Sequence, residues 1–267
     1  MDIFSQLTAP TVVFVILGVL MGILLAVAAR AFSIKRDERI ERITSALPGA
    51  NCGGCGYAGC SALAEAIAKG EAKTSACSAG GSSVQKSIAD IMGVSDGDPV
   101  EMMAHVTCAG SCGVSRKKFL YSGAPDCASA ERLGGGDKVC PNGCIGLGTC
   151  VAHCPFGALS VKEGIAHVDE ALCRGCGVCV TFCPKNVIKL VPKKSPVRMK
   201  CVSTDSGKAV RSYCEAGCIG CKLCEKACEI GAVKVINNVA VIDHDKCIGC
   251  GKCADKCPRK VLEIKAV

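Results

Sequence analysis

Three segments of this chain repeat the pattern C-x-x-C-x-x-C-x-x-x-C, and this spacing constrains the fold more than any other feature. The chain has 25 cysteines in 267 residues, a share typical of disulfide frameworks, structural zinc sites or iron–sulfur clusters. The odd total and the tight spacing disfavour disulfides, because cysteines in adjacent turns of one loop seldom pair with each other. Zinc ribbons use pairs of C-x-x-C, whereas two of these runs contain four cysteines and end in proline. The pattern therefore favours iron–sulfur clusters over zinc and disulfides.

The net charge of +8 counts every thiol as neutral. A basic excess of this size could indicate nucleic acid or an anionic membrane surface as a partner. A 4Fe-4S core with four thiolates carries roughly −2, so six of them would bring the chain to about −4. Since only nine residues are aromatic and no basic–aromatic platform is present in the sequence, we expect no nucleic-acid partner.

Residues 9–29 contain no charged side chain and are long enough to cross a bilayer as one helix. A cleavable signal peptide would need a basic leader, but the leader MDIFSQ carries only Asp2. A buried soluble helix is the other alternative. Basic residues follow the segment at Arg30, Lys35, Arg36, Arg39 and Arg42. This asymmetry predicts a single-pass anchor in the inner (cytoplasmic) membrane, with the cysteines on the cytoplasmic side. A reducing cytoplasm also suits thiols that bind metal.

The four-cysteine runs are typical of bacterial two-cluster ferredoxins, in which three cysteines hold one cluster and the fourth holds the other. Eighteen residues separate Cys154 from Cys173, and eighteen separate Cys228 from Cys247. Each spacer alternates like a hairpin, with turns expected at Glu163-Gly164 and Asn237-Asn238. The strands expected around these turns are 158–162 with 165–168 and 232–236 with 239–242. We therefore expect two ferredoxin-like domains with two clusters each.

A fourth segment, from Cys144 to Cys154, precedes these runs and departs from the pattern. In it, Leu147 stands where the second ligand is expected. Cys140 lies four residues before Cys144, just as Cys214 lies four residues before Cys218, so Cys140 is predicted to supply the missing ligand. The alternative is a three-iron cluster with Cys140 unused. The predicted ligand sets are Cys140, Cys144, Cys150 with Cys183; Cys173, Cys176, Cys179 with Cys154; Cys218, Cys221, Cys224 with Cys257; and Cys247, Cys250, Cys253 with Cys228.

Two further groups of cysteines precede these domains. The sequence C-G-G-C-G-Y-A-G-C and a later cysteine predict a cluster held by Cys52, Cys55, Cys60 and Cys77, with a helix at 61–69 returning the chain. Cys108, Cys112 and Cys127 are predicted to hold a further cluster, with Cys201 or Cys214 as the fourth ligand and Cys201 preferred. Buried inert thiols are the alternative for this last group.

The expected fold is α+β: an N-terminal transmembrane helix, a small four-cysteine iron–sulfur domain and two ferredoxin-like 2[4Fe-4S] domains. The expected boundaries are an extracytoplasmic N-terminus at 1–8, the helix at 9–29, a linker at 30–45, the four-cysteine domain at 46–95, a cysteine insert at 96–135, the first ferredoxin-like domain at 136–190, a connector at 191–213 and the second ferredoxin-like domain at 214–267. No nucleophile–base arrangement is recognisable in the sequence, so no complete active site is expected on this chain.

The N-terminal span, the C-G-G-C-G-Y-A-G-C motif and the ferredoxin motifs together resemble the B subunit of the Rnf complex, an ion-pumping ferredoxin:NAD⁺ oxidoreductase. The second ferredoxin pair and the Cys108–Cys127 insert are departures from the shorter members and resemble the long form. The predicted ligand sets amount to five or six [4Fe-4S] clusters. The resemblance implies that these clusters pass electrons from soluble reduced ferredoxin to membrane partner subunits. It also implies that the NAD and flavin sites and the ion path lie on other subunits.

Two alternatives remain at this point. The chain could be a ferredoxin-like arm of another membrane complex, such as a hydrogenase or a quinone-linked reductase, or a zinc-stabilised scaffold. For the donor, we expect acidic ferredoxin to dock on the basic residues Lys185, Lys189, Lys193, Lys194 and Arg198, although a solvated charged loop explains them equally well.

Overall fold

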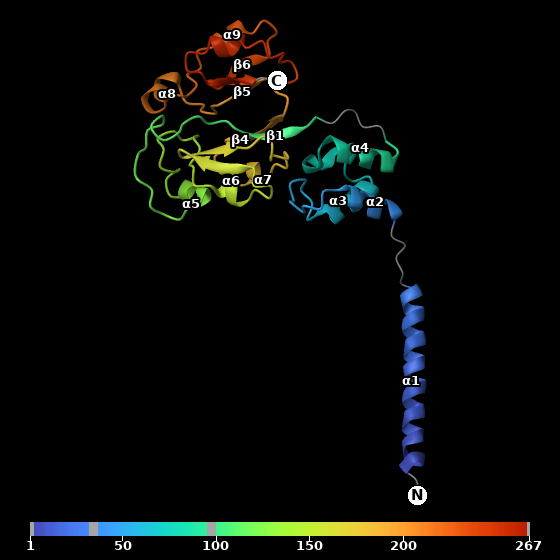
Figure 1. Ribbon diagram of the computed structural model, residues 1–267. Helices are drawn as coiled ribbons and strands as arrows, with labels where there is room; N and C mark the ends of the chain where they lie inside the picture. Colours follow the sequence, from blue (N-terminus) through green and yellow to red (C-terminus); the bar gives the residue numbers. More distant parts are fainter. Residues whose placement is uncertain (1–2, 32–36, 95–99, 266–267) are drawn as a thin grey trace. The chain divides into compact units, whose positions relative to one another are not determined.

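The computed structural model describes residues 3–31, 37–94 and 100–265 of the chain (Figure 1). The chain divides into two compact units, Met1–Glu38 and Arg39–Val267. The described part of the first unit is dominated by one long helix, and the second unit contains all of the cysteines.

Helix α1 (Ile3–Ala31) forms the first unit. Within it, Thr11–Arg30 has a mean hydropathy of 3.0 and is long and apolar enough to cross a membrane. Its apolar side chains from Val12 to Val27 are exposed on all sides, and Phe14 is 75% exposed. Because a helix that is apolar all round needs protein or lipid around it, α1 has the character of a membrane span.

The second unit begins with a helical region around the first four cysteines. It contains α2 (Glu38–Ala46), α3 (Cys60–Ala68), η1 (Thr74–Ala76), η2 (Ser78–Gly80) and α4 (Gly81–Met92). Ile40, Ile43 and Leu47 recur at the spacing of one helical face, so α2 buries Ile43 against α3 and α4. The helix expected at 61–69 is confirmed as α3. This core therefore begins at α2, within the segment expected to be a linker.

Two structural repeats follow, which we call the first repeat (102–192) and the second repeat (197–264). The first repeat contains β1 (Met102–Val106), α5 (Cys127–Arg132), α6 (Thr149–Ala152), β2 (Leu159–Lys162), β3 (Ile165–Val168), α7 (Val178–Thr181) and β4 (Ile188–Pro192). The second repeat contains β5 (Val197–Met199), α8 (Gly207–Tyr213), α9 (Leu223–Ala227), β6 (Val233–Ile236), β7 (Val239–Ile242), α10 (Lys252–Asp255) and β8 (Leu262–Ile264).

The central hairpin of each repeat agrees with the sequence-based expectation. Strand β2 pairs antiparallel with β3, and β6 pairs with β7. In both turns the two central residues have positive φ, with 49° at Glu163 and 71° at Gly164 in the first repeat. Two successive positive φ values are characteristic of the tight turn whose twist matches a two-stranded ribbon. Both predicted hairpins are confirmed.

An outer pair of strands closes each repeat and was not expected from the sequence. Strand β1 pairs antiparallel with β4 (Figure 1). Strand β5 pairs antiparallel with β8. The segments expected to be an insert and a connector thus contribute β1 and β5 to the repeats. These short strands depend on partners far along the chain, so local patterning alone gives little signal for them.

Candidate metal centres

The four cysteines of the helical region line one cavity. Cys52, Cys55, Cys60 and Cys77 surround it, together with the backbone of the glycine-rich loop. Asn51 accepts a hydrogen bond from the backbone N–H of Cys60 at 2.8 Å, and Gln85 donates to the carbonyl oxygen of Cys77 at 3.1 Å. These contacts fix both ends of the motif. The structure therefore brings together the four residues that the C-G-G-C-G-Y-A-G-C motif singled out.

In the first repeat, a second cavity is lined by Cys127, Cys144, Cys150 and Cys183. This grouping differs from the sequence-based interpretation, in which Cys140 replaced the ligand missing at Leu147. In the structure Cys127 lines this cavity and Cys140 does not, because the first turn of α5 packs against Ile145, with Leu147 alongside. A residue about twenty positions upstream thus completes the set, which the spacing of the run alone does not reveal.

A side-chain clasp holds Cys127 in this cavity. Asp126 precedes α5 and accepts hydrogen bonds from the backbone N–H and the hydroxyl of Ser129 at 2.8 and 2.9 Å. Thr149 donates its hydroxyl hydrogen to Asp126 at 2.8 Å and accepts the backbone N–H of Cys127 at 2.7 Å. The hydrogen bonds from Ser129 and Thr149 lower the pKa of Asp126 to about 2. The carboxylate of Asp126 therefore stays ionised at neutral pH. Its stabilising effect is lost only as the pH falls below about 4 towards 2.

The third cavity also belongs to the first repeat. Its four thiols belong to Cys154, Cys173, Cys176 and Cys179, as expected from the motif. Backbone N–H groups point at two of these sulfurs, from Ala158 to Cys154 at 3.3 Å and from Ala104 to Cys173 at 3.4 Å. Such hydrogen bonds offset thiolate charge and raise the potential of a bound cluster. Strand β1 thus contributes a donor to a site far along the chain.

Cys176 is shared between this cavity and the one in the helical region. A Cβ atom placed on Gly54 would lie 2.1 Å from the carbonyl oxygen of Cys176, so only glycine permits this approach. The glycine-rich loop of the helical region therefore packs directly against a cysteine of the first repeat.

In the second repeat, seven of the eight cysteines expected to hold clusters lie close to their expected partners. Burial raises the pKa of Cys224 to about 11, and the nearby Cys218, Cys257 and Cys221 also raise it. Burial likewise raises the pKa of Cys253, with added effects from Cys247 and Cys228. Cys221 and Cys250 are exposed, so this repeat brings two of its thiols to the surface.

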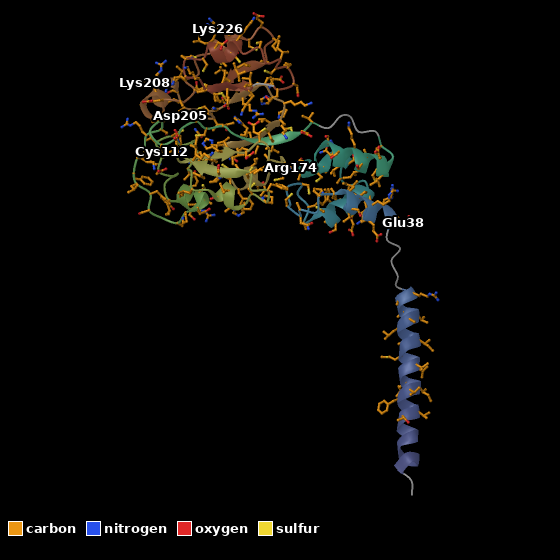
Figure 2. The ribbon with its side chains drawn as sticks, in the orientation of Figure 1. Glu38, Cys112, Arg174, Asp205, Lys208 and Lys226 are labelled. Atoms are coloured by element: carbon orange, nitrogen blue, oxygen red, sulfur yellow. The ribbon has the colours of Figure 1, made fainter. Side chains whose placement is uncertain are left out.

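A fourth cavity is lined by cysteines from both repeats: Cys108, Cys140, Cys201 and Cys214. The sequence-based interpretation instead grouped Cys108 with Cys112 and Cys127 and added Cys201 or Cys214. The structure does not bring those three together, since Cys127 lines the second cavity and Cys112 is exposed on a surface loop (Figure 2). Cys112 donates its backbone N–H to Glu163 at 2.8 Å, which holds it beside the β2–β3 turn.

The cavities suit a positively charged core with several metal atoms. Burial raises the pKa of Cys150 to about 12, and neighbouring Cys144, Cys127 and Cys183 raise it as well. Bare thiolates would therefore repel each other, and bound iron supplies the compensating charge. The thiols line the walls of these cavities, as the ligands of a polynuclear cluster do.

Comparison with known proteins supports this chemistry. The B subunit of a sodium-translocating ferredoxin:NAD⁺ oxidoreductase complex from Acetobacterium woodii is 44% identical over 97% of this chain and 78% of that protein. The B subunit of an ion-translocating oxidoreductase complex from Methanosarcina acetivorans is 43% identical over 93% of this chain and 95% of that protein. The chain belongs to this family of B subunits. A third member, from Clostridium ljungdahlii, is 42% identical over 94% of this chain and is named as proton-translocating.

Family models locate iron–sulfur segments in this chain. A model described as "Putative Fe-S cluster" matches residues 47–79, and two models described as 4Fe-4S dicluster domains match residues 172–232 and 217–262. None of these segments contains Cys108, Cys127 or Cys140. The structure therefore supplies information about these three cysteines that the family models do not.

The basic residues considered as a docking site are not all available in this family member. Arg198 is only 2% exposed and forms an ion pair with Glu170 at 2.7 Å. The side chain of Lys185 is 7% exposed and pairs with Glu131 at 2.5 Å. Both therefore stabilise the fold, whereas Lys189, Lys193 and Lys194 remain exposed.

Proposed function

We propose that this chain is the iron–sulfur electron-transfer subunit of a membrane-bound, ion-translocating ferredoxin:NAD⁺ oxidoreductase. The observation that carries the proposal is the set of cysteine-lined cavities in a chain of this family. Each [4Fe-4S] cluster, when bound, stores and releases one electron without proton transfer. The ligands we assign to five of them are Cys52, Cys55, Cys60, Cys77; Cys127, Cys144, Cys150, Cys183; Cys154, Cys173, Cys176, Cys179; Cys218, Cys221, Cys224, Cys257; and Cys228, Cys247, Cys250, Cys253.

The protein contributes ligands, shielding from water and hydrogen bonds. Buried Cys144, Cys150 and Cys179 keep their sites away from water, and the N–H groups of Ala104 and Ala158 donate to sulfur. These groups set how readily each site accepts an electron. Electrons can then pass from one cluster to the next along the cavities of the chain. Catalytic chemistry on NAD⁺ and ion movement belong to the partner subunits in this proposal.

Soluble reduced ferredoxin is the proposed electron donor, and the second repeat is the proposed docking surface. Cys221 and Cys250 are its exposed thiols, so clusters held there lie nearest to an external donor. Lys222 and Lys226 are exposed beside Cys221, and Figure 2 shows Lys226 at the outer end of this repeat. Positive charge beside an exposed ligand would steer an acidic ferredoxin towards it.

The membrane arrangement follows from α1 and the basic residues after it. The relatives are named as parts of ion-translocating complexes, and α1 provides an apolar helix of membrane-spanning length. We propose that α1 anchors the chain in the inner membrane and that Arg39 and Arg42 help to keep the cysteine-rich unit on the cytoplasmic side. The relatives are named for sodium in one case and protons in another, so similarity in this chain does not distinguish the ion.

The test uses the full-length protein purified without oxygen in detergent. Stoichiometric reduced ferredoxin should bleach its visible absorption, while NADH alone should leave it oxidised. Charge reversal of Lys222 and Lys226 should slow the bleaching and weaken its salt dependence, whereas reversal of exposed Lys189 and Lys193 serves as the matched control. Full reduction by dithionite together with no electron uptake from ferredoxin would contradict the proposed donor.

A further inference from the structure

The cavity between the two repeats is built from equivalent positions in each of them. Cys108 follows β1 by two residues, and Cys201 follows β5 by two residues. Cys140 precedes Cys144 by four residues, and Cys214 precedes Cys218 by four residues. All four thiols line one cavity, so each repeat contributes the same two positions to it.

Backbone contacts around these sulfurs follow the same internal symmetry. The backbone N–H of Cys144 donates to the sulfur of Cys108 at 3.4 Å, and that of Cys218 donates to the sulfur of Cys201 at 3.3 Å. Gly143 and Gly217 also correspond. A Cβ atom on Gly143 would lie 3.5 Å from the Cys140 sulfur, and one on Gly217 would lie 3.6 Å from the Cys214 sulfur. Both repeats thus bring their backbone close to the sulfur atoms, as iron–sulfur sites require.

The cavity also contains groups suited to a negatively charged cluster. Lys138 lines it and is only 4% exposed, and its ammonium group donates to the carbonyl oxygens of Gly110 at 2.7 Å and Gly164 at 2.8 Å. Ser115 also lines it and is 5% exposed, and its hydroxyl is among the few buried polar groups in the described residues without a hydrogen-bond partner. A buried hydroxyl without a partner is costly unless a ligand accepts its hydrogen.

From this arrangement we infer that Cys108, Cys140, Cys201 and Cys214 hold an additional [4Fe-4S] cluster that joins the two repeats. The buried ammonium of Lys138 offsets its charge, and the hydroxyl of Ser115 donates to one of its sulfur atoms. The site differs from the motif-encoded sites, because neither repeat contains all four ligands.

Contacts between the two repeats hold the walls of this site together. Ser115 forms a backbone bridge with Cys214, and the backbone N–H of Arg116 donates to Tyr213 at 2.8 Å. On the other side, His105 of β1 makes a hydrogen bond to the carbonyl oxygen of Met199 of β5 at 2.7 Å. These contacts tie together the two repeats that supply the four thiols.

The position of the site gives it a role as a connector, and this part of the inference rests on the proposed function. The Cys144–Cys108 and Cys218–Cys201 hydrogen bonds link it to a motif-encoded ligand set in each repeat. Cys176 provides the corresponding link to the helical region. One electron enters the connector from one repeat and one leaves to the other, so the step balances without making or breaking a bond.

The test compares Cys201→Ala with Cys112→Ala in the full-length chain purified without oxygen. The unmodified chain should contain about 24 iron atoms, Cys201→Ala about 20, and Cys112→Ala about 24, since Cys112 belongs to none of the six ligand sets. The inference would be overturned if the unmodified chain contained only about 20 iron atoms. It would also be overturned if the Cys201→Ala substitution removed zinc and left the iron content unchanged. Iron content does not depend on the donor, so failure of ferredoxin to reduce the chain would leave this result intact.

A second variant covers the case in which Cys201→Ala does not fold. Ser115→Ala should retain about 24 iron atoms but shift one reduction step to a more negative potential, because one hydrogen bond to sulfur is lost. Exposed Ser122 provides the control, and Ser122→Ala should leave every step unchanged. Reduction steps that are identical in Ser115→Ala and the unmodified chain would argue against a cluster in this cavity.

Discussion

Replacing Thr149 by valine is expected to release Cys127 from the first repeat. Valine keeps the shape of threonine but cannot accept the backbone N–H of Cys127, which Thr149 accepts at 2.7 Å. It also cannot donate to Asp126, whose carboxylate caps α5. Both Thr149 and Cys127 are buried, so water does not readily replace the missing acceptor.

The expected cost follows from the buried N–H group. Leaving one buried donor unsatisfied costs about 1–3 kcal/mol. For a unit of this size, each kcal/mol lowers Tm by about 2–4 °C, so the expected decrease in Tm is about 2–12 °C. Because Cys127 supplies one of four thiols in its cavity, loss of its position should also favour loss of about four iron atoms from this site.

Anaerobic thermal unfolding, followed by the visible absorption of the clusters, measures both effects. Thr181 provides the matched control, since it is an exposed threonine of α7, and Thr181→Val should leave Tm and iron content unchanged. If Thr149→Val has the Tm and the iron content of the unmodified chain, the clasp does not position Cys127 and the reasoning is refuted.

Three further predictions concern the ligand set, the tight turns and pH. Cys127→Ala should remove about four iron atoms, measured by iron analysis, while Leu147→Ala should remove none; equal iron in Cys127→Ala and the unmodified chain would contradict the assignment. Gly146→Ala should lower Tm more than the equivalent Gly220→Ala, because the added Cβ would lie 2.2 Å from the Gly164 oxygen but 3.0 Å from the Asn238 oxygen; the reverse order would contradict it. Burial raises the pKa of Glu170, but Lys265 and Arg198 lower it by more, so its folded pKa lies below the usual 4.5. Its stabilising effect is therefore present above about pH 4.5 and lost as the pH falls further, and Tm of the unmodified chain should fall more steeply in that range than Tm of Glu170→Gln.

Much of the fold could be predicted because its signals are local. The hairpins follow from alternating apolar residues on either side of Glu163-Gly164 and Asn237-Asn238, and the structure contains both. The span at 9–29 follows from hydropathy alone and lies within α1. In each case, one short window of sequence contains the whole signal.

The ligand groups that could not be predicted depend on contacts between distant segments. Cys127 reaches its cavity through a helix cap and Thr149, and neither contributes to the cysteine spacing. Cys108 and Cys201 can be recognised as equivalent only once β1 and β5 are known, and these strands require β4 and β8 as partners. Proximity in sequence predicts Cys140 as the substitute for the ligand missing at Leu147, whereas the fold places Cys140 beside Cys214.

The central claim is that this chain is a conductor made of iron–sulfur clusters, and the metal and sulfide content of the full-length protein tests it most directly. Protein purified without oxygen should be brown and contain about 24 iron and about 24 sulfide per chain, with no zinc. A colourless protein that contains zinc and no sulfide would contradict the account.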